Sequence, residues 1–332
     1  MIKKIIEISQ AKTHLAIRYG QLVIRQEDPT SPTRASQQNA ASQSSKGLRR
    51  VSASLRETSI PCEDIGVLLV DHSGVTYTHS VFTELLRCGA AIVLCAGDHH
   101  PTGMLLPIES NSVQTERFRQ QIEVKEPVKK KLWQQIVRAK IRHQAKLVGQ
   151  GSDTYKALMA LREQVRSGDP DNIEAQASKR FWAAYIQDIT SNFHRNVEGR
   201  APNNMLNYGY MVMRAAVARA LCSAGLLPCL GIHHCNRYNA FCLADDMIEP
   251  FRGFIERKVR DVCARGGVPD ELSQPIKAAI LEVLYEEVKI GGFGRLTGDG
   301  FAGPLMVGLH RTAASLQRCF AGEQKELDLP EL

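Results

Sequence analysis

The chain opens with an alternation of apolar and polar positions that is typical of β-strands. Residues 1 to about 26 contain the segments KKIIEIS and THLAIRYGQLVIRQ, the second interrupted at Tyr19 and Gly20. Such alternation places successive side chains on opposite faces of a sheet. Two more apolar runs, DIGVLLVD and GAAIVLCAG, enclose a helical pattern over about 78–88. A dinucleotide-binding half is the alternative interpretation, but no G-x-G-x-x-G follows either strand.

Residues 27–59 interrupt this pattern. The segment is rich in Ser, Gln, Ala and Pro and nearly lacks large apolar side chains. Such a composition buries too little surface to offset the entropy lost on ordering. We therefore predict a mobile loop over 27–59.

From about residue 112 the apolar positions recur every three or four residues, which indicates helices. The segments that show this are KKKLWQQIVRAKIRHQAKLV, EAQASKRFWAAYIQDI, NYGYMVMRAAVARALCSAG, PFRGFIERKVRDVCARGG and PIKAAILEVLYEEV. Gly225 and Gly266 lie where helices are expected to end. The predicted fold class is thus α+β, with a small β-rich N-terminal domain (1–105), a linker (106–111) and a larger all-α domain (112–332).

Positive charge is concentrated in one part of the chain. The formal net charge is +7, and residues 112–147 alone hold ten Lys or Arg and three Glu, a difference of 10 − 3 = +7. A solvated helix face is the simpler explanation of such a run. A phosphate-bearing polymer is the functional one, because neutralising phosphates releases counterions and drives binding. The DNA-contact candidates in this segment are Lys129, Lys130, Lys131, Arg138 and Arg142.

The nine cysteines are odd in number and lie mostly among apolar neighbours. Free buried thiols in a reducing cytoplasm are the expected state, and no apolar run is long enough to predict a membrane span. A zinc site from Cys229, His233, Cys235 and Cys242 stays open as an alternative, although the usual C-x(2–4)-C spacing is absent.

The segment HHCNRYNAFCLADDMIEPFR, residues 233–252, brings imidazoles and carboxylates to the two ends of an apolar stretch. His234 and Glu249 are fifteen residues apart, which suits two segments that fold back on each other. Glu174, beside the apolar stripe of another predicted helix, is a candidate third ligand. Two carboxylates and one imidazole suit Mn²⁺ or Mg²⁺ better than a structural zinc. The alternative is ordinary ion pairing, with Lys179 or Arg180 as the partner of Glu174.

Three motifs in this order resemble the CRISPR-associated integrase of spacer adaptation, CRISPR-associated protein one, in its type II form. They are NIEAQASKRFWAAY, PNNMLNYGYMVMRAAVARAL and GIHHCNRYNAFCLADDMIEPFR. The similarity also runs through THLAIRYGQLVI, IGVLLVD and LLPIESN, so it covers most of the chain. One departure is the segment 27–59, which is longer than the corresponding connection in type II members. It puts partner contacts of the N-terminal domain in doubt.

The resemblance implies that Glu174, His234 and Glu249 are the metal ligands. Asp246 matches a family aspartate that is not counted as a ligand, and His233 is the neighbour of the ligand. Tyr208, in NYGY, matches a tyrosine near the family's catalytic site. The family often has basic residues at three further positions, which implies phosphate contacts for Arg180, Arg237 and Arg252. Salt bridges with Asp245 or Glu256 are the structural alternative for these arginines.

The resemblance also implies an activity and its partners. The expected protein is a metal-dependent DNA endonuclease and integrase that uses Mg²⁺ or Mn²⁺ and inserts captured DNA as new spacers into a CRISPR array. The expected partners are double-stranded DNA, the second CRISPR-associated adaptation protein that bridges two homodimers, and the RNA-guided effector nuclease of the system. The alternative from another class is a non-catalytic DNA-binding scaffold whose carboxylates are paired within the core.

Overall fold

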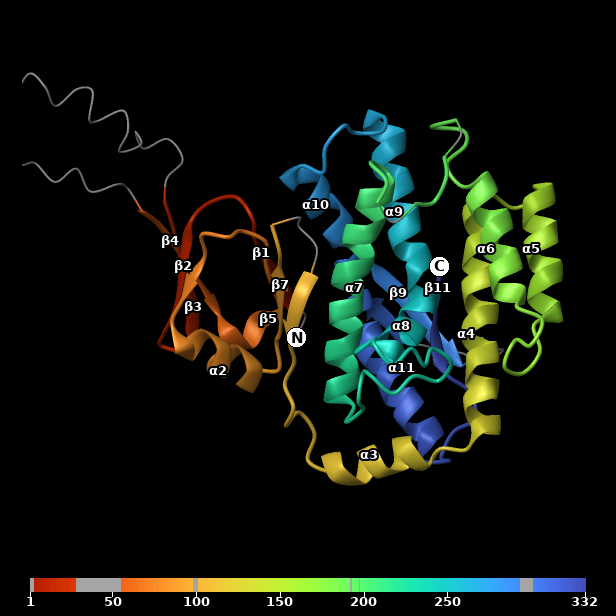
Figure 1. Cartoon of the computed structure of the whole chain (residues 1–332), viewed down its shortest axis with the longest axis horizontal. Helices are drawn as coiled ribbons and strands as arrows, with labels where there is room; N and C mark the ends of the chain where they lie inside the picture. The colour runs from red at the N-terminus through yellow and green to blue at the C-terminus, as the bar shows by residue number, and fades with distance from the viewer. Residues whose placement is uncertain (1–2, 28–54, 98–100, 192, 197, 293–300) are drawn as a thin grey trace, which may run out of the picture. The chain divides into compact units, whose positions relative to one another are not determined.

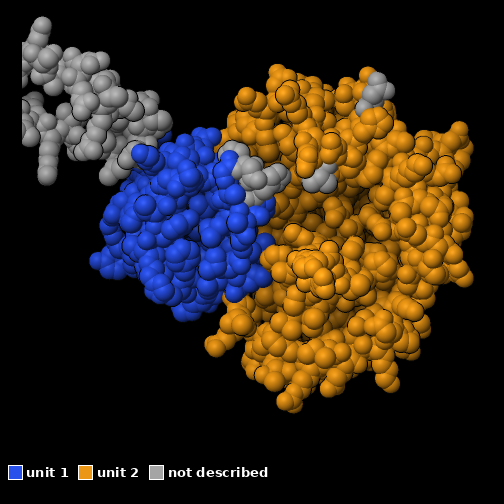
Figure 2. Space-filling model, in the orientation of Figure 1, with its two compact units in different colours: residues 1, 3–106 blue, residues 2, 107–332 orange. Residues whose placement is uncertain are grey.

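The computed structural model describes residues 3–27, 55–97, 101–191, 193–196, 198–292 and 301–332. They form two compact units, Lys3–Leu106 and Pro107–Leu332 (Figures 1 and 2). The N-terminal unit is β-rich and the C-terminal unit is mostly helical, which confirms the α+β prediction. Within the described residues, no helix has the length and apolarity needed to span a membrane.

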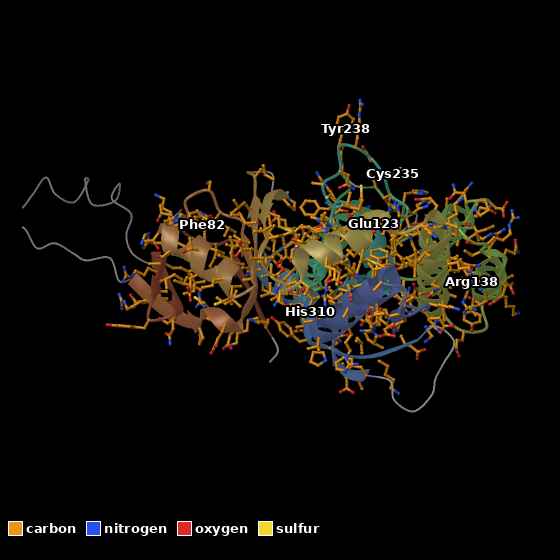
Figure 3. All side chains as sticks on the ribbon, turned by 90° about the horizontal axis from the view of Figure 1, so that it is seen from below. Phe82, Glu123, Arg138, Cys235, Tyr238 and His310 are labelled. Atoms are coloured by element: carbon orange, nitrogen blue, oxygen red, sulfur yellow. The ribbon has the colours of Figure 1, made fainter. Side chains whose placement is uncertain are left out.

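The C-terminal unit is built around two long helices, α4 (Glu126–Leu147) and α7 (Asn203–Ser223). Two of the shorter helices in this unit contact both α4 and α7. The other elements of this unit are α3 (Gln114–Glu123), α5 (Asp153–Gln164), α6 (Ile173–Ala184), α8 (Cys242–Ile248), η3 (Glu249–Phe251), α9 (Arg252–Gly266), α10 (Gln274–Leu281), η4 (Glu282–Tyr285) and α11 (Leu305–Phe320). Segment 224–241 joins α7 to α8 and carries Cys235 and Tyr238 outward, with Tyr238 at its tip (Figure 3).

The C-terminal unit also contains a small antiparallel sheet that the sequence did not predict. Its strand order is β10 (Phe301–Pro304), β9 (Glu287–Gly292), β11 (Asp328–Glu331). The helical pattern expected up to residue 288 ends earlier, because η4 is followed directly by β9. Each of these strands has only four to six residues. Segments this short carry too few alternations to be distinguished from loop by pattern alone.

The N-terminal unit contains two four-stranded sheets. One has the order β1 (Lys4–Ile8), β5 (Ile65–Val70), β7 (Ala91–Cys95), β8 (Pro101–Leu105), in which the first three strands are parallel. Helix α2 (His79–Arg87) lies between β5 and β7 in the chain, as the sequence predicts. The other has the order β4 (Leu55–Pro61), β3 (Gln21–Glu27), β2 (Thr13–Arg18), β6 (Thr76–Tyr77).

The turn between β2 and β3 follows directly from its two residues. Tyr19 and Gly20 both have positive φ, 51° and 71°, which is the requirement of the tight turn that joins two antiparallel strands. The strands then pair so that Leu15 faces Ile24 across the sheet. The apolar positions of both strands consequently reach the same buried side.

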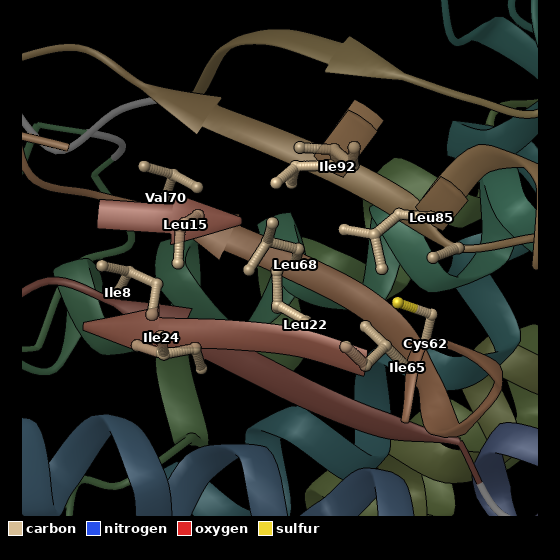
Figure 4. Close-up of a cluster of buried hydrophobic side chains, with 12 residues drawn as sticks. Ile8, Leu15, Leu22, Ile24, Cys62, Ile65, Leu68, Val70, Leu85 and Ile92 are labelled. Atoms are coloured by element: carbon tan, nitrogen blue, oxygen red, sulfur yellow. The ribbon is translucent and has the colours of Figure 1, made fainter. Parts of the chain in front are cut away.

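The core of this unit is a cluster of buried side chains from β1, β2, β3, β5, β7 and α2 (Figure 4). Strand β5, with the sequence IGVLLV, is buried at every position, which is typical of a strand covered on both faces. The predicted loop 27–59 is wrong at both ends, because residue 27 belongs to β3 and β4 begins at Leu55. Its remaining part, 28–54, lies outside the described residues. β4 was missed because its polar sequence, LRETSIP, lacks an apolar face.

Candidate active site

The two glutamates predicted from the sequence as metal ligands, Glu174 and Glu249, contact the same lysine. Glu174 lies in the first turn of α6, and Glu249 is the first residue of η3. Lys140 Nζ, from α4, is 2.5 Å from Oε1 of Glu174 and 2.6 Å from Oε2 of Glu249. The alternative pairing of Glu174 with Lys179 or Arg180 is therefore wrong, since the cation that contacts Glu174 is Lys140, 34 residues earlier in the chain.

Glu249 is held more tightly than Glu174. It is 5% exposed, and Arg252 Nε donates a hydrogen bond of 2.9 Å to its Oε1. Its Oε2 accepts no hydrogen bond from the described residues. The contact of Oε2 with Lys140 is therefore an ion pair whose angles do not meet those of a hydrogen bond. Burial opposes ionisation of Glu249, but Arg252 and Lys140 outweigh it and lower the pKa to about 2. Glu249 is therefore a carboxylate throughout the neutral range.

His234 is oriented by a fully buried aspartate. Its Nδ1 donates to Oδ1 of Asp246 at 2.6 Å, so the neutral ring presents the lone pair of Nε2. Asp246 also accepts the backbone N–H groups of Ile232, His233 and His234 at 2.6, 3.0 and 3.2 Å. The hydrogen bond to Asp246 raises the pKa of His234, and the nearby charge of Glu249 adds to that effect. An imidazole held by a carboxylate in this way is the usual arrangement of a metal-ligating histidine.

Helix α4 positions all of these groups through one face. Trp133 stacks on His233 with ring centroids 4.2 Å apart and meets the edge of His234 at 5.7 Å. Lys140 follows two turns later, about 10 Å along the helix axis. His143 comes next, with its Nδ1 3.0 Å from the carbonyl oxygen of Pro250, the neighbour of Glu249.

The burial of Lys140 could have been recognised in the sequence, although the identity of its partners could not. Lys140 and His143 lie in line with Trp133 and Ile136 at helical spacing, and all four side chains are buried. A lysine on an apolar stripe requires a carboxylate partner, because an unpaired buried charge is very costly. The prediction for this segment named Lys129, Lys130, Lys131, Arg138 and Arg142 as DNA contacts and did not include Lys140.

Proline 250 determines how Asp246 and Glu249 diverge. It lies in the 3₁₀ turn η3, between the end of α8 and the start of α9. Proline cannot donate a backbone hydrogen bond, so a tighter turn replaces the α-helix there. Asp246, in α8, contacts the His234 segment, whereas Glu249 contacts α4 and Arg252.

A pocket of about 570 Å³ opens beside His234. Among its lining residues are Lys129, Asn236, Arg237 and Asn239. Arg237 is exposed, and its guanidinium lies 4.6 Å from the ring centroid of Tyr238. The pocket thus joins the candidate imidazole to cationic and amide side chains that suit an anionic ligand.

The arginines chosen as DNA contacts have different surroundings. Arg180 is exposed, as are Lys130 and Lys131. Arg138 donates to the backbone oxygen of Val165 at 3.0 Å, and Arg142 lies 3.5 Å from Glu331. These two arginines bind neighbouring parts of the protein, in contrast to the exposed group.

Arg252 and the aromatic residues behind it form a buried network. Arg252 pairs with Glu249, not with Asp245 or Glu256, and its guanidinium lies 4.5 Å from the ring centroid of Tyr210. Asp245 is paired with Arg214 instead. The Tyr208 ring, two residues from Tyr210, lies 5.3 Å from Lys277 Nζ, and its catalytic role stays a prediction.

The buried network makes the stability of the protein depend on pH in two opposite ways. Burial lowers the pKa of His143 to about 3 and raises that of Glu256 to about 7. As the pH falls from 6.5 to 4.5, His143 destabilises the fold because only the unfolded chain takes up its proton. Over the same range Glu256 stabilises it, because the folded chain takes up a proton first. Each group changes the free energy of unfolding by about 1.4 kcal/mol per pH unit, and the two changes have opposite signs, so they largely cancel.

Two substitutions are expected to separate these slopes. In His143→Gln, the free energy of unfolding should rise as the pH falls from 6.5 to 4.5, because the contribution of Glu256 is no longer offset by that of His143. In Glu256→Gln it should fall. Urea unfolding at pH 4.8, 5.5 and 6.2 measures both slopes, and equal slopes in the two variants would contradict this account.

The described residues contain no group of three or more His, Cys, Asp or Glu side chains arranged to hold a metal ion. His234 packs at the Trp133 end of α4, whereas Glu174 and Glu249 enclose Lys140. None of the nine cysteines forms a disulfide, and Cys229 and Cys235 are exposed. The two convergent carboxylates and the lone pair of His234 Nε2 nevertheless are donor atoms of the kind that a divalent cation such as Mg²⁺ or Mn²⁺ takes.

Sequence relatives point to one family. Residues 8–280 match the family described as CRISPR associated protein Cas1. The CRISPR-associated endonuclease Cas1 of Neisseria meningitidis is 37% identical over 234 residues, which cover 70% of this chain and 76% of the relative. A CRISPR-associated endonuclease Cas1 of Pyrobaculum aerophilum is 26% identical over 290 residues, or 82% of this chain and 93% of the relative.

Solved structures of low sequence identity share the fold. A casposase bound to integration product superposes with a TM-score of 0.74 at 15% identity, covering 98% of this chain and 92% of that one. The Cas1 protein of Thermotoga maritima gives 0.67 at 14% identity, covering 99% and 100%. A chain of a Cas6-RT-Cas1–Cas2 complex gives 0.71 at 15% identity, covering 99% of this chain and 36% of that one. With more than half of its length matched and a relative above 30% identity, the chain belongs to the Cas1 family.

Proposed function

We propose that this protein is a metal-dependent DNA endonuclease and integrase that inserts captured DNA fragments into a CRISPR array. The observation that carries the proposal is that carboxylates from two separate elements, Glu174 of α6 and Glu249 of η3, converge on one point. The hydrogen bond to Asp246 also leaves the Nε2 lone pair of His234 available. The endonuclease name of the Neisseria relative supports the same class of activity.

Glu174, Glu249 and Nε2 of His234 would hold Mg²⁺ or Mn²⁺. When bound, such a cation polarises a phosphoryl oxygen and stabilises the charge that develops on phosphorus. Asp246 keeps the proton of His234 on Nδ1, and Arg252 holds the carboxylate of Glu249 in place. The exposed Lys130, Lys131 and Arg180, with Arg237 beside the pocket, would bind DNA phosphates without reading sequence.

The proposed reaction is a transesterification. The 3′ oxygen of the captured fragment forms a bond to phosphorus in the array, and the bond from that phosphorus to the 3′ oxygen of the array strand breaks. The hydroxyl proton leaves the attacking oxygen, and the departing oxygen takes up a proton. The number of phosphodiester bonds is unchanged, so the exchange needs no external energy source.

The proposal extends to the partners. Double-stranded DNA is the proposed substrate, and a solved complex that names both Cas1 and Cas2 supports a second adaptation protein as a partner. We further propose that this partner bridges two homodimers of the chain. The RNA-guided effector nuclease of the system is a further proposed partner. The basic face of α4 supplies the charge that an assembly on DNA requires.

An integration assay tests the function. Purified chain, with and without the second adaptation protein, is incubated with a plasmid carrying a repeat array and a labelled duplex ending in a 3′-hydroxyl. Label should enter the plasmid only with Mn²⁺ or Mg²⁺, and Glu174→Gln should abolish it. Glu323→Gln, at an exposed glutamate, is the matched control that should retain it. A fragment ending in a dideoxynucleotide should not be joined.

A non-catalytic DNA-binding scaffold is the second candidate. One observation favours it, since both glutamates are ion-paired with Lys140, as carboxylates of a purely structural core would be. If the protein is a scaffold, it should bind DNA but give no joined product under any condition of the integration assay. Joined product that depends on Glu174 excludes the scaffold.

A further inference from the structure

Lys140 is a cation enclosed by the protein at the point where the two candidate ligands meet. It is 8% exposed and comes from the middle of a 22-residue helix, so it is not a mobile surface lysine. Its ammonium contacts Glu174 and Glu249 within 2.6 Å. Residues on both sides of it, Ala139 and Ile141, are buried, which fixes the backbone that carries it.

The charges around these carboxylates already balance. Glu174 and Glu249 contribute two negative charges, and Lys140 and Arg252 contribute two positive charges within direct contact. A divalent cation added to this neutral cluster leaves an excess of two positive charges. Such an excess in a buried site is costly unless an anion accompanies the cation or an internal cation moves away.

We propose that Lys140 acts as an internal competitor of the divalent cation, holding Glu174 and Glu249 together when the protein is free of metal. The proposal rests on the metal-dependent function and adds a regulation to it. Binding of the cation to these carboxylates requires the Lys140 ion pairs to break. A DNA phosphate can then offset the excess positive charge, so cation binding and DNA binding strengthen each other. Because such coupling is reciprocal, the protein alone binds the cation weakly and the DNA complex binds it tightly.

The test measures Mn²⁺ binding rather than turnover. Free Mn²⁺ is followed by electron paramagnetic resonance as it is titrated into the full chain, with and without a duplex whose 3′ ends are dideoxy. Lys140→Met removes the charge and keeps the length of the side chain. Lys156→Met makes the same change at an exposed lysine whose ion-pair partner is Asp153 on its own helix. Circular dichroism and thermal melts of each metal-free protein are recorded alongside.

Without DNA, Lys140→Met should bind Mn²⁺ about fivefold or more tightly than the unmodified chain, and Lys156→Met should bind it equally. DNA should strengthen Mn²⁺ binding more in the unmodified chain than in Lys140→Met. The metal-free melting temperature of Lys140→Met should fall, with recovery on adding Mn²⁺. If Lys140→Met does not fold, Lys140→Gln removes the charge while retaining hydrogen-bond donors.

The outcomes separate this inference from the function on which it rests. Equal or weaker Mn²⁺ binding by the folded Lys140 variant overturns the competitor role, while Mn²⁺ binding that Glu174→Gln weakens still supports the metal-dependent function. Mn²⁺ binding by the unmodified chain that neither Glu174→Gln nor Glu249→Gln weakens overturns both.

Discussion

Replacing His234 with alanine is expected to lower Mn²⁺-dependent strand transfer by about 100-fold or more, while the chain stays folded and still binds DNA. Changes to groups that only orient a metal ligand already cost roughly 10–100-fold, and removal of the ligand itself should cost at least as much. The His234 side chain is 44% exposed, so its loss should alter the free energy of unfolding by only about 1 kcal/mol.

The measurement is the initial rate of joining at saturating DNA, together with DNA affinity by fluorescence anisotropy. His233→Ala is the matched control, because it removes the neighbouring imidazole, which stacks on Trp133. The hydrogen bond from His233 to Asp246 comes from its backbone N–H, so the substitution keeps it. Full activity in His234→Ala, or equal loss in both variants, would show that His234 has no special role.

Asp246→Asn should give a graded version of the same effect. The side-chain amide has no negative charge to hold the Nδ1–H of His234. Its NH₂ group is a donor, so it cannot replace a carboxylate oxygen that now accepts a hydrogen bond from a backbone N–H such as that of Ile232. We expect a loss of roughly 10–100-fold in joining and a higher Mn²⁺ requirement. Because Asp246 is fully buried, stability should fall as well, by about 2 kcal/mol.

Replacing Glu249 with leucine is expected to lower the free energy of unfolding by about 3–5 kcal/mol in the metal-free protein. The change leaves Arg252 without its carboxylate and Lys140 with only Glu174. Removing one partner of a buried ion pair costs more than the pair contributed, because the remaining charge stays out of water.

Urea unfolding at pH 7 in the presence of a chelator measures this loss. Glu126→Leu is the control. The Glu126 side chain is 68% exposed, so its ion pair with Lys129 should contribute less than about 1 kcal/mol to the free energy of unfolding. Losses of similar size in the two variants would show that the Glu249 cluster is not electrostatically buried.

The alternation of polar and apolar residues was sufficient for most of the fold. It predicted the β2–β3 hairpin, the strands β5 and β7, and the long helices α4 and α7, because each of these buries a continuous face or stripe. Among the strands, it missed β4, β6, β8, β9, β10 and β11. These strands form through backbone hydrogen bonds to neighbouring strands, and their own sequences carry no clear strand pattern. The neighbouring strands are brought into place only when the chain folds.

The candidate ligands were also identifiable from the sequence, through residue types and the order of three motifs. What the sequence did not reveal is that Glu174 and Glu249 share Lys140, across separations of 34 and 109 residues. Local patterns describe which face of a helix is apolar, but not which charge from another element will meet it.

The amino-acid sequence by itself determined the α+β class, the family resemblance and the side chains available for chemistry. Only the tertiary structure decided that α4 presents Trp133, Lys140 and His143 to the site, while exposing Lys130 and Lys131 on another face. The physical reason is that the cost of burying a charge depends on its partners in space. Those partners come from segments that the chain brings together only on folding.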